Sequence, residues 1–351
     1  MPFSTAEYEK LLSGFFVRDA AFGQVANELV FFLVEEVDPD RHLEDGWKNR
    51  ILRVLLGTTE AGRFFATSVN KLSFASLSSG AGEKAETVVV DTGLQVWSMR
   101  SKDDKGYETQ IPFDGKGYGY QDVGEVGCAI TKTVRVGHTV FAVGAPMRVF
   151  ERTAGQQWVT HEEIPIPAGL KLGRSDEEIR AALSDANLND LAGLNEQEMY
   201  AVGHAGTLWQ RTQGKWRQRA FPTNLDLFTV AVAPDGTAYI TDRRCSVWKG
   251  QEERWERIVQ ADSTLPYQDS VWFAGRLWCT NDSAGPFVLE GKKMVPAHQA
   301  KKDPMPAQVA CFAHRIDVSP DGKTMLVAGR HGAATYDGKT WTVLFDGMPD
   351  D

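Results

Sequence analysis

The chain has 351 residues, of which 42% are hydrophobic and 24% charged, so it can bury a substantial core without help from disulfide bonds or metals. Its formal net charge of −9 opposes binding to DNA or RNA, because nucleic-acid affinity comes mostly from cationic side chains. No run approaches the roughly 18 apolar residues of a transmembrane helix, and residues 1–7 lack the pattern of a secretion signal. We therefore expect a cytoplasmic protein that contacts neither nucleic acid nor membrane.

The first half of the chain begins with a short helix and continues with strands. Ser4, followed three residues later by Glu7, is a capping-box pattern that predicts a helix over residues 4–12. The expected strands of this half cover residues 28–34, 63–69, 71–77, 86–90, 95–99 and 107–111. We assign the first of these strands to one sheet, the next three to a second sheet and the last two to a third.

A repeat of about 40 residues runs through the second half of the chain. Three aromatic pairs share a spacing of 39 residues: Tyr200 and Tyr239, Trp209 and Trp248, and Trp216 and Trp255. Related units cover residues 138–160, 275–280 and 323–344. Asp-Gly dipeptides in several units supply the positive φ that tight hairpin turns require.

Short strands that recur every ~40 residues are typical of a β-propeller, in which four-stranded blades pack face to face. We therefore predict an all-β propeller of seven blades, with six blades as the alternative, and a single domain over residues 1–351. Residues 162–197 form an expected insertion between two blades. Within it, Ser175 followed by acidic residues predicts a second helix over about 175–185.

The sequence shows no catalytic or metal-binding motif. The four cysteines are far apart and form no Cys-x-x-Cys pair, which favours free thiols over a zinc site. The seven histidines show neither His-Glu-x-x-His nor His-x-His spacing, and no nucleophile, base and orienting group occur together in one segment. We therefore expect no catalytic residues, no metal and no cofactor.

The segment from about Leu194 to Ile258 carries the most characteristic residues of the repeat. They lie at positions 197–203, 206–209, 221–225, 233–236 and 255–258. This segment resembles bacterial cytosolic β-propellers of the WD40/YVTN-like repeat superfamily whose genes lie beside polymorphic-toxin or type VI secretion loci. The resemblance implies a non-catalytic, protein-binding propeller, and in particular an immunity protein that neutralises a secreted toxin or effector.

Two other functions stay open from the sequence. A propeller enzyme of the glycosidase, lyase or lactonase type takes its catalytic groups from different blades, so the absence of a contiguous motif does not exclude it. A sugar-binding, lectin-like propeller is the other alternative. A neighbouring toxin gene would favour immunity, whereas a sugar-utilisation operon would favour the enzyme or the lectin.

The repeat register predicts which loops meet a protein partner. In a propeller, the loop after each blade's second strand lies on the same face as the segment that enters the next blade. Arginines in such loops, and tyrosines on the glycine-rich segment 115–122, are residue types that recur in protein interfaces. We predict that partner binding involves Tyr118, Tyr120, Gln121, Asp122, His204, Asp242, Arg243, Arg244, Asp282, Arg330 and His331.

Overall fold

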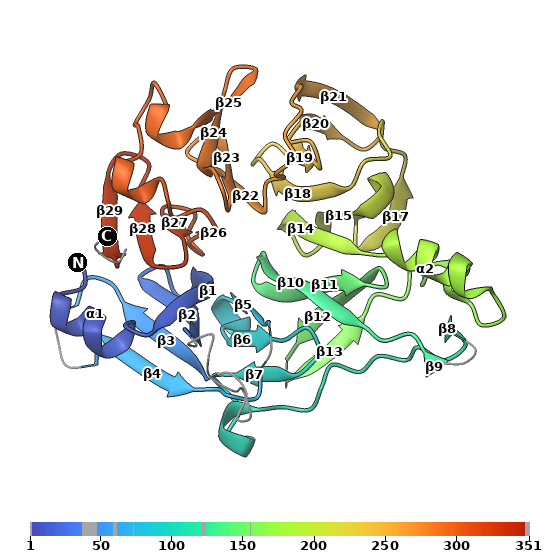
Figure 1. Cartoon of the computed structure of the whole chain (residues 1–351), viewed down its shortest axis with the longest axis horizontal. Helices are drawn as coiled ribbons and strands as arrows, with labels where there is room; N and C mark the ends of the chain where they lie inside the picture. The colour runs from blue at the N-terminus through green and yellow to red at the C-terminus, as the bar shows by residue number, and fades with distance from the viewer. Residues whose placement is uncertain are drawn as a thin grey trace. The chain divides into compact units, whose positions relative to one another are not determined.

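The computed structural model describes residues 2–36, 48–58, 62–72, 74–120, 124–154 and 156–347. Seven successive antiparallel sheets in this part of the chain form a seven-blade β-propeller, which confirms the predicted fold class (Figure 1). Contacts divide the chain into two compact units, Met1–Thr87 with Tyr267–Asp351 (unit 1) and Val88–Pro266 (unit 2). No helix in the described part of the chain is long and apolar enough to cross a membrane.

Unit 1 contains helix α1 (Thr5–Leu11), three four-stranded blades and one strand of blade 2. Blade 1 consists of β1 (Phe15–Phe22), β2 (Glu28–Glu35), β3 (Asn49–Leu55) and β4 (Phe64–Ser68). Blade 6 consists of β22 (Asp269–Phe273), β23 (Arg276–Asn281), β24 (Gly285–Glu290) and β25 (Lys293–Pro296). Blade 7 consists of β26 (Arg315–Val318), β27 (Met325–Ala328), β28 (Gly332–Tyr336) and β29 (Trp341–Asp346).

Blade 2 has three strands, β5 (Ser76–Ser79), β6 (Thr87–Val90) and β7 (Val96–Ser98), and the boundary between the units falls within β6. The remaining blades belong to unit 2. Blade 3 consists of β10 (Ala129–Val136), β11 (Thr139–Ala145), β12 (Arg148–Thr153) and β13 (Gln157–Thr160). Blade 4 consists of β14 (Leu188–Asn195), β15 (Glu198–Gly203), β16 (Leu208–Thr212) and β17 (Lys215–Arg219). Blade 5 consists of β18 (Leu227–Val232), β19 (Ala238–Asp242), β20 (Val247–Gln251) and β21 (Arg254–Val259).

Both predicted helices are present, the first with the capping box predicted at Ser4 and the second with the N-cap predicted at Ser175, which the structure shows to be a capping box as well. In α1, Ser4 and Glu7 exchange side-chain and backbone hydrogen bonds, and Ser175 and Glu178 do the same in α2 (Asp176–Ser184). Each reciprocal pair satisfies backbone N–H groups that the first helical turn leaves free. Helix α2 lies in the predicted insertion, but β14 also falls within residues 162–197 and already belongs to blade 4.

The structure corrects the predicted grouping of strands between residues 63 and 111. The segment 64–68 is the outer strand of blade 1, and residues 76–79 rather than 71–77 form the next strand. Beyond β7, the predicted strand 107–111 is represented by an isolated bridge between Tyr107 and Trp97. The grouping was wrong because β1 was overlooked: its charged pair at residues 18–19 interrupts an apolar run, so β2 was taken as a first strand.

The aromatic residues of the repeat occupy equivalent places in blades 4 and 5. Trp209 and Trp248 lie on the third strands β16 and β20, and each is 7% exposed. Trp248 packs with Tyr200, Val202 and Ile240 in an apolar cluster that joins blade 4 to blade 5. The 39-residue spacing therefore reflects one packing position between successive sheets.

We predict that Trp248→Ala lowers the free energy of unfolding by about 3–5 kcal/mol, because removal of a buried indole leaves a cavity between two sheets. Urea denaturation followed by circular dichroism measures this loss. The control Trp248→Phe keeps an aromatic ring in the cluster but loses the indole N–H bond to Asp242, so it should cost less than the alanine variant without being neutral. A loss below about 1 kcal/mol for the alanine variant would contradict the packing described here.

Candidate functional site

A β-bulge recurs near the start of the first strand in four blades. The pairing between first and second strands shifts register at residues 17–19, 130–132, 188–190 and 227–229. The paired residues that follow the bulges are Asp19, Lys132, Asp190 and Thr229. Because a bulge re-aims the side chains around it, this end of the first strands presents polar groups inside an otherwise apolar sheet.

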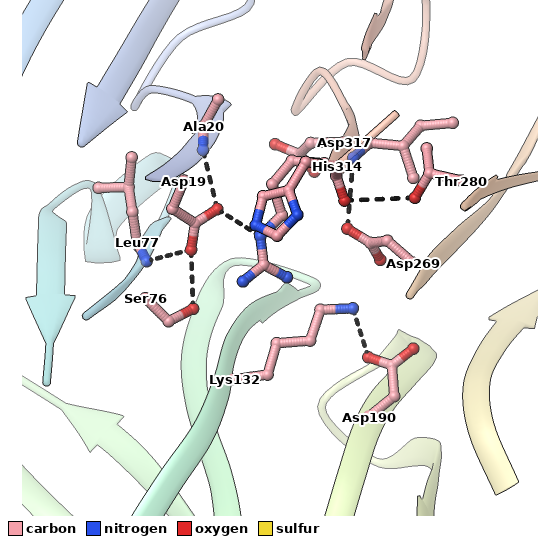
Figure 2. Close-up of polar contacts among 12 residues, drawn as sticks. Asp19, Ala20, Ser76, Leu77, Lys132, Asp190, Asp269, Thr280, His314 and Asp317 are labelled. Atoms are coloured by element: carbon pink, nitrogen blue, oxygen red, sulfur yellow. Dashed lines mark hydrogen bonds and ion pairs between the residues drawn. The ribbon is translucent and has the colours of Figure 1, made fainter. Parts of the chain in front are cut away.

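In unit 1, Asp19 joins the first strands of three blades through hydrogen bonds and an ion pair (Figure 2). Its Oδ1 accepts a hydrogen bond from the Ala20 backbone N–H (2.8 Å) and lies 3.0 Å from Arg315 Nε of β26. Its Oδ2 accepts hydrogen bonds from Leu77 N (2.8 Å) and Ser76 Oγ (2.9 Å) of β5. This carboxylate is only 3% exposed, so these contacts replace its hydration.

In unit 2, Asp190 repeats the arrangement. Its Oδ1 accepts a hydrogen bond from Lys132 Nζ of blade 3 (2.7 Å; Figure 2) and another from its neighbour Leu191 N (2.9 Å). Its Oδ2 accepts one from Val230 N of blade 5 (3.0 Å). Asp269 bonds likewise to its own strand and to β26 of the following blade. Buried carboxylates thus tie together the starts of adjacent first strands.

We predict that Asp190→Ala lowers the free energy of unfolding by about 3–5 kcal/mol, because it leaves the Lys132 ammonium buried without its carboxylate partner. The double variant Lys132→Met with Asp190→Leu should recover much of this loss, since it removes both charges together. Chemical denaturation of both variants provides the measurement. Equal losses in the single and double variants would show that the ion pair does not account for the effect.

We call the end of the sheets at which first strands begin the tip face. The loops between second and third strands lie at this same end, because neighbouring strands in each blade are antiparallel. These loops follow Gly203, Asp242, Asn281 and Ala328, the last residues of β15, β19, β23 and β27. Most of the predicted partner-binding residues belong to these loops.

In unit 1 the tip face contains a cavity of about 530 Å³. Three of the predicted residues, Asp282, Arg330 and His331, line it. Its wall also includes Arg18, Cys311, Phe312 and His314, which the sequence analysis did not select. The cavity therefore brings together residues from β1, from the blade 6 and blade 7 tip loops and from the segment that leads into β26.

Asp282 is the acidic group of this cavity, and it is engaged by His314. His314 Nδ1 lies 2.8 Å from Asp282 Oδ1. Burial alone would raise the pKa of Asp282, but the His314 hydrogen bond and the positive charges of His314, Arg315 and Arg18 outweigh it, so that pKa lies below its ordinary value. The pKa of the Arg18 guanidinium is lowered, first by its own burial and then by the charge of Arg315.

Arg330 and His331 are held at the rim by neighbouring elements. The Arg330 guanidinium lies over the Phe16 ring, 4.6 Å from its centroid, and the Arg330 carbonyl accepts a hydrogen bond from Val17 N (2.7 Å). His331 Nε2 lies 3.5 Å from Glu36 Oε1. The stacking contact holds the guanidinium over the ring, and stacking does not use the N–H groups of an arginine.

Arg18 reaches the cavity because it is the bulged residue of β1, unpaired between Val17 and Asp19. The sequence contained one signal for it, a charged pair at positions 18–19 within the apolar run 15–22. In a regular strand, Arg18 and Asp19 would point to opposite faces, whereas the bulge changes the face on which these side chains lie. The bulge is recognised from the pairing of β1 with β2, so the sequence of β1 alone does not reveal it.

In unit 2, β19 ends at the buried Asp242, and two exposed arginines, Arg243 and Arg244, follow it in the loop. Asp242 is 1% exposed, and its carboxylate accepts hydrogen bonds from the backbone N–H of Arg244 and from an indole N–H, so it stabilises the turn from within. Arg243 and Arg244 have side chains 68% and 59% exposed, with loose ion pairs to Asp226 (3.5 Å) and Asp262 (3.7 Å). Arg244 also lines a smaller tip-face cavity of about 190 Å³.

The other predicted residues of unit 2 lie around α2. His204 follows β15, and its Nδ1 lies 2.5 Å from the carbonyl oxygen of Ser184 at the end of α2. Tyr118 makes a β-bridge with Lys171 and packs on the apolar cluster beneath α2. Tyr120 belongs to β8 (Gly119–Tyr120), which pairs with β9 (Gly124–Glu125). Gln121 and Asp122 lie outside the described residues.

Within the described part of the chain, no group of three or more His, Cys, Asp or Glu side chains is arranged to hold a metal ion. The same residues include four cysteines without disulfide partners, of which Cys311 is exposed and Cys245 and Cys279 are buried. Burial raises the pKa of the Cys128 thiol to about 12 and also raises that of Cys311.

The fold is a seven-blade β-propeller, and solved structures agree at the level of the fold. The chain is similar to the WD40 β-propeller domain of Doa1 (TM-score 0.51, 12% identity, 90% of each chain covered) and to the RRP9 WD40 repeats (0.54, 8%, 90% of this chain and 88% of that one). It is also similar to an inactive virginiamycin B lyase from Staphylococcus aureus with quinupristin (0.55, 9%, 95% and 94%).

In sequence, the chain is similar to Immune protein Tsi7 of Pseudomonas aeruginosa. The two are 29% identical over 152 residues, which make up 43% of this chain and 47% of Tsi7. The match therefore spans about half the length of that relative. No protein-family model matches the chain.

We predict that Asp282→Asn lowers the free energy of unfolding by about 0.5–1 kcal/mol at neutral pH, a small value because the side chain is 46% exposed. Since its pKa is lowered in the folded protein, Asp282 contributes stability above the ordinary Asp pKa, and this contribution disappears as the pH falls through the lowered value. Urea denaturation at several pH values between 7 and 3 measures the difference. Asp262→Asn, at a more exposed ion pair, serves as the control, and a pH-independent difference for Asp282→Asn would contradict the assignment.

Proposed function

We propose that this chain is an immunity protein, a non-catalytic propeller that binds a bacterial toxin in the cytoplasm and neutralises it. The observation that carries the proposal is the 152-residue similarity to Immune protein Tsi7. The fold fits this role, because a propeller presents many loops at one end of its sheets on a rigid scaffold.

The tip face is the surface we propose for toxin binding. Arg243 and Arg244 extend from a turn that Asp242 stabilises from within, so they are free to change partners without loss of the turn. Arginine is enriched among residues that dominate binding energy, and its exposed ion pairs with Asp226 and Asp262 cost little to exchange. Asp282, Arg330 and His331 supply the corresponding groups in unit 1.

A propeller enzyme is the alternative function. The similarity to virginiamycin B lyase supports it only at the level of the fold, since 9% identity transfers no catalytic residue. Turnover of a glycan or cyclic-peptide substrate that is abolished by one carboxylate or histidine substitution on the tip face would favour the enzyme. Growth protection without turnover would favour immunity.

The test of immunity is growth. The protein encoded beside this chain's gene is expressed in a laboratory bacterium with and without the chain. We predict that it stops growth alone, that the chain restores growth, and that the two proteins co-purify as a complex. Growth arrest that the chain does not relieve, together with no measurable complex, would contradict the proposed function.

The complex between the chain and the toxin also allows a test of whether the tip face is the binding surface. We predict that Arg243→Ala with Arg244→Ala weakens toxin binding about tenfold or more, whereas Lys323→Ala with Lys339→Ala at the hairpin turns of the opposite sheet end leaves it unchanged. Calorimetric titration of the purified proteins measures both. The reverse pattern would place the binding surface at the hairpin turns instead.

A further inference from the structure

The unit 1 cavity contains two arginines, Arg18 and Arg330, that form no ion pair with a carboxylate of the described residues. Among the described residues, neither Arg18 nor Arg330 has a carboxylate oxygen within 4.0 Å, the limit of an ion pair, and Arg18 Nε is buried with no hydrogen-bond partner. A buried guanidinium N–H without an acceptor is costly, so the described residues leave the Arg18 side chain incompletely hydrogen-bonded.

The carboxylates nearest to these arginines are already engaged by other groups. Asp282 contacts His314, and Asp19 accepts several hydrogen bonds and pairs with Arg315. Glu36 faces His331 at the rim. Their remaining negative charge moderates the positive potential of the cavity, which disfavours a highly charged polyanion and suits a single carboxylate.

The apolar part of the wall indicates where such a carboxylate would come from. Phe16, stacked beneath Arg330, and the buried ring of Phe312 line the same cavity of about 530 Å³. This volume accommodates a few side chains, and the combination of arginine with aromatic rings is typical of protein-binding hot spots. A free phosphate ion would make no use of the aromatic wall.

We propose that this cavity receives an acidic side chain of the protein partner, flanked by an apolar residue, with Arg18 and Arg330 as the ion-pair donors. This inference rests on the proposed function for the existence of a protein partner. The inference specifies one contact of the complex, in which a Glu or Asp carboxylate of the partner accepts N–H hydrogen bonds from two guanidinium groups. Hydrogen bonds between two charged groups are stronger than those from a guanidinium to a neutral amide.

The test uses a synthetic peptide, N-acetyl-Phe-Glu-Glu-Phe-amide, and its glutamine counterpart, titrated into the full chain and followed by calorimetry. We expect the glutamate peptide to bind at least tenfold more tightly than the glutamine peptide, and to weaken as salt is raised. Arg18→Gln and Arg330→Gln should each reduce its affinity about tenfold. Arg217→Gln, an exposed strand arginine of unit 2, is the matched control and should have no effect.

Cys311 supplies a second readout, because its exposed thiol lines the cavity. The glutamate peptide should slow alkylation of Cys311 by iodoacetamide, whereas the glutamine peptide at the same concentration should not. Equal affinity for the two peptides, or arginine variants that bind like the parent while their thermal melts show an intact fold, would overturn the inference. Binding of inorganic phosphate with no binding of the peptide would also overturn it.

The growth assay separates this inference from the proposed function. Toxin protection that persists in Arg18→Gln and Arg330→Gln would refute the carboxylate contact while leaving immunity supported. Absence of protection by the parent chain, together with specific peptide binding, would refute immunity while leaving a carboxylate-binding cavity.

Discussion

The structure depends on buried carboxylates that bond across neighbouring first strands. Blades pack through apolar faces, which are non-directional and leave one sheet free to slide on the next. Asp19 and Asp190 add directional bonds, since each accepts a hydrogen bond from its own strand and others from a neighbouring blade. Charge pairing with Arg315 or Lys132 makes removal of any one member expensive. These bonds fix the ends of the strands from which the tip loops extend.

This arrangement separates structural side chains from side chains that are free to bind. Asp242 illustrates the division: its buried carboxylate satisfies the backbone of the turn, and the two arginines that follow it extend into solvent. At the unit 1 cavity, Asp282 is occupied by His314, whereas Arg18 and Arg330 have no such partner among the described residues. Substitutions at exposed tip positions can therefore change the binding partner with little effect on the propeller.

The sequence predicted much of the fold because the repeat encodes packing directly. The 39-residue spacing of Trp209 and Trp248 corresponds to one buried position between sheets, and the capping box at Ser4 and the N-cap serine at Ser175 begin helices as expected. Strand assignment was wrong around residues 63–111, where spacing is irregular and one blade has three strands. The tip loops were selected from register alone, but the burial of Asp242 and the participation of Arg18 depend on turn geometry and a bulge.

We propose that the tip face, with its arginines, binds a toxin. Hydrogen–deuterium exchange of the full chain, with and without the proposed toxin, tests this most directly. The account predicts slower exchange on binding at residues 16–18, 243–246, 311–314 and 329–332, with no change at the hairpin turns 233–237 and 319–324. Protection confined to those hairpin turns, with unchanged exchange in the tip segments, would contradict it.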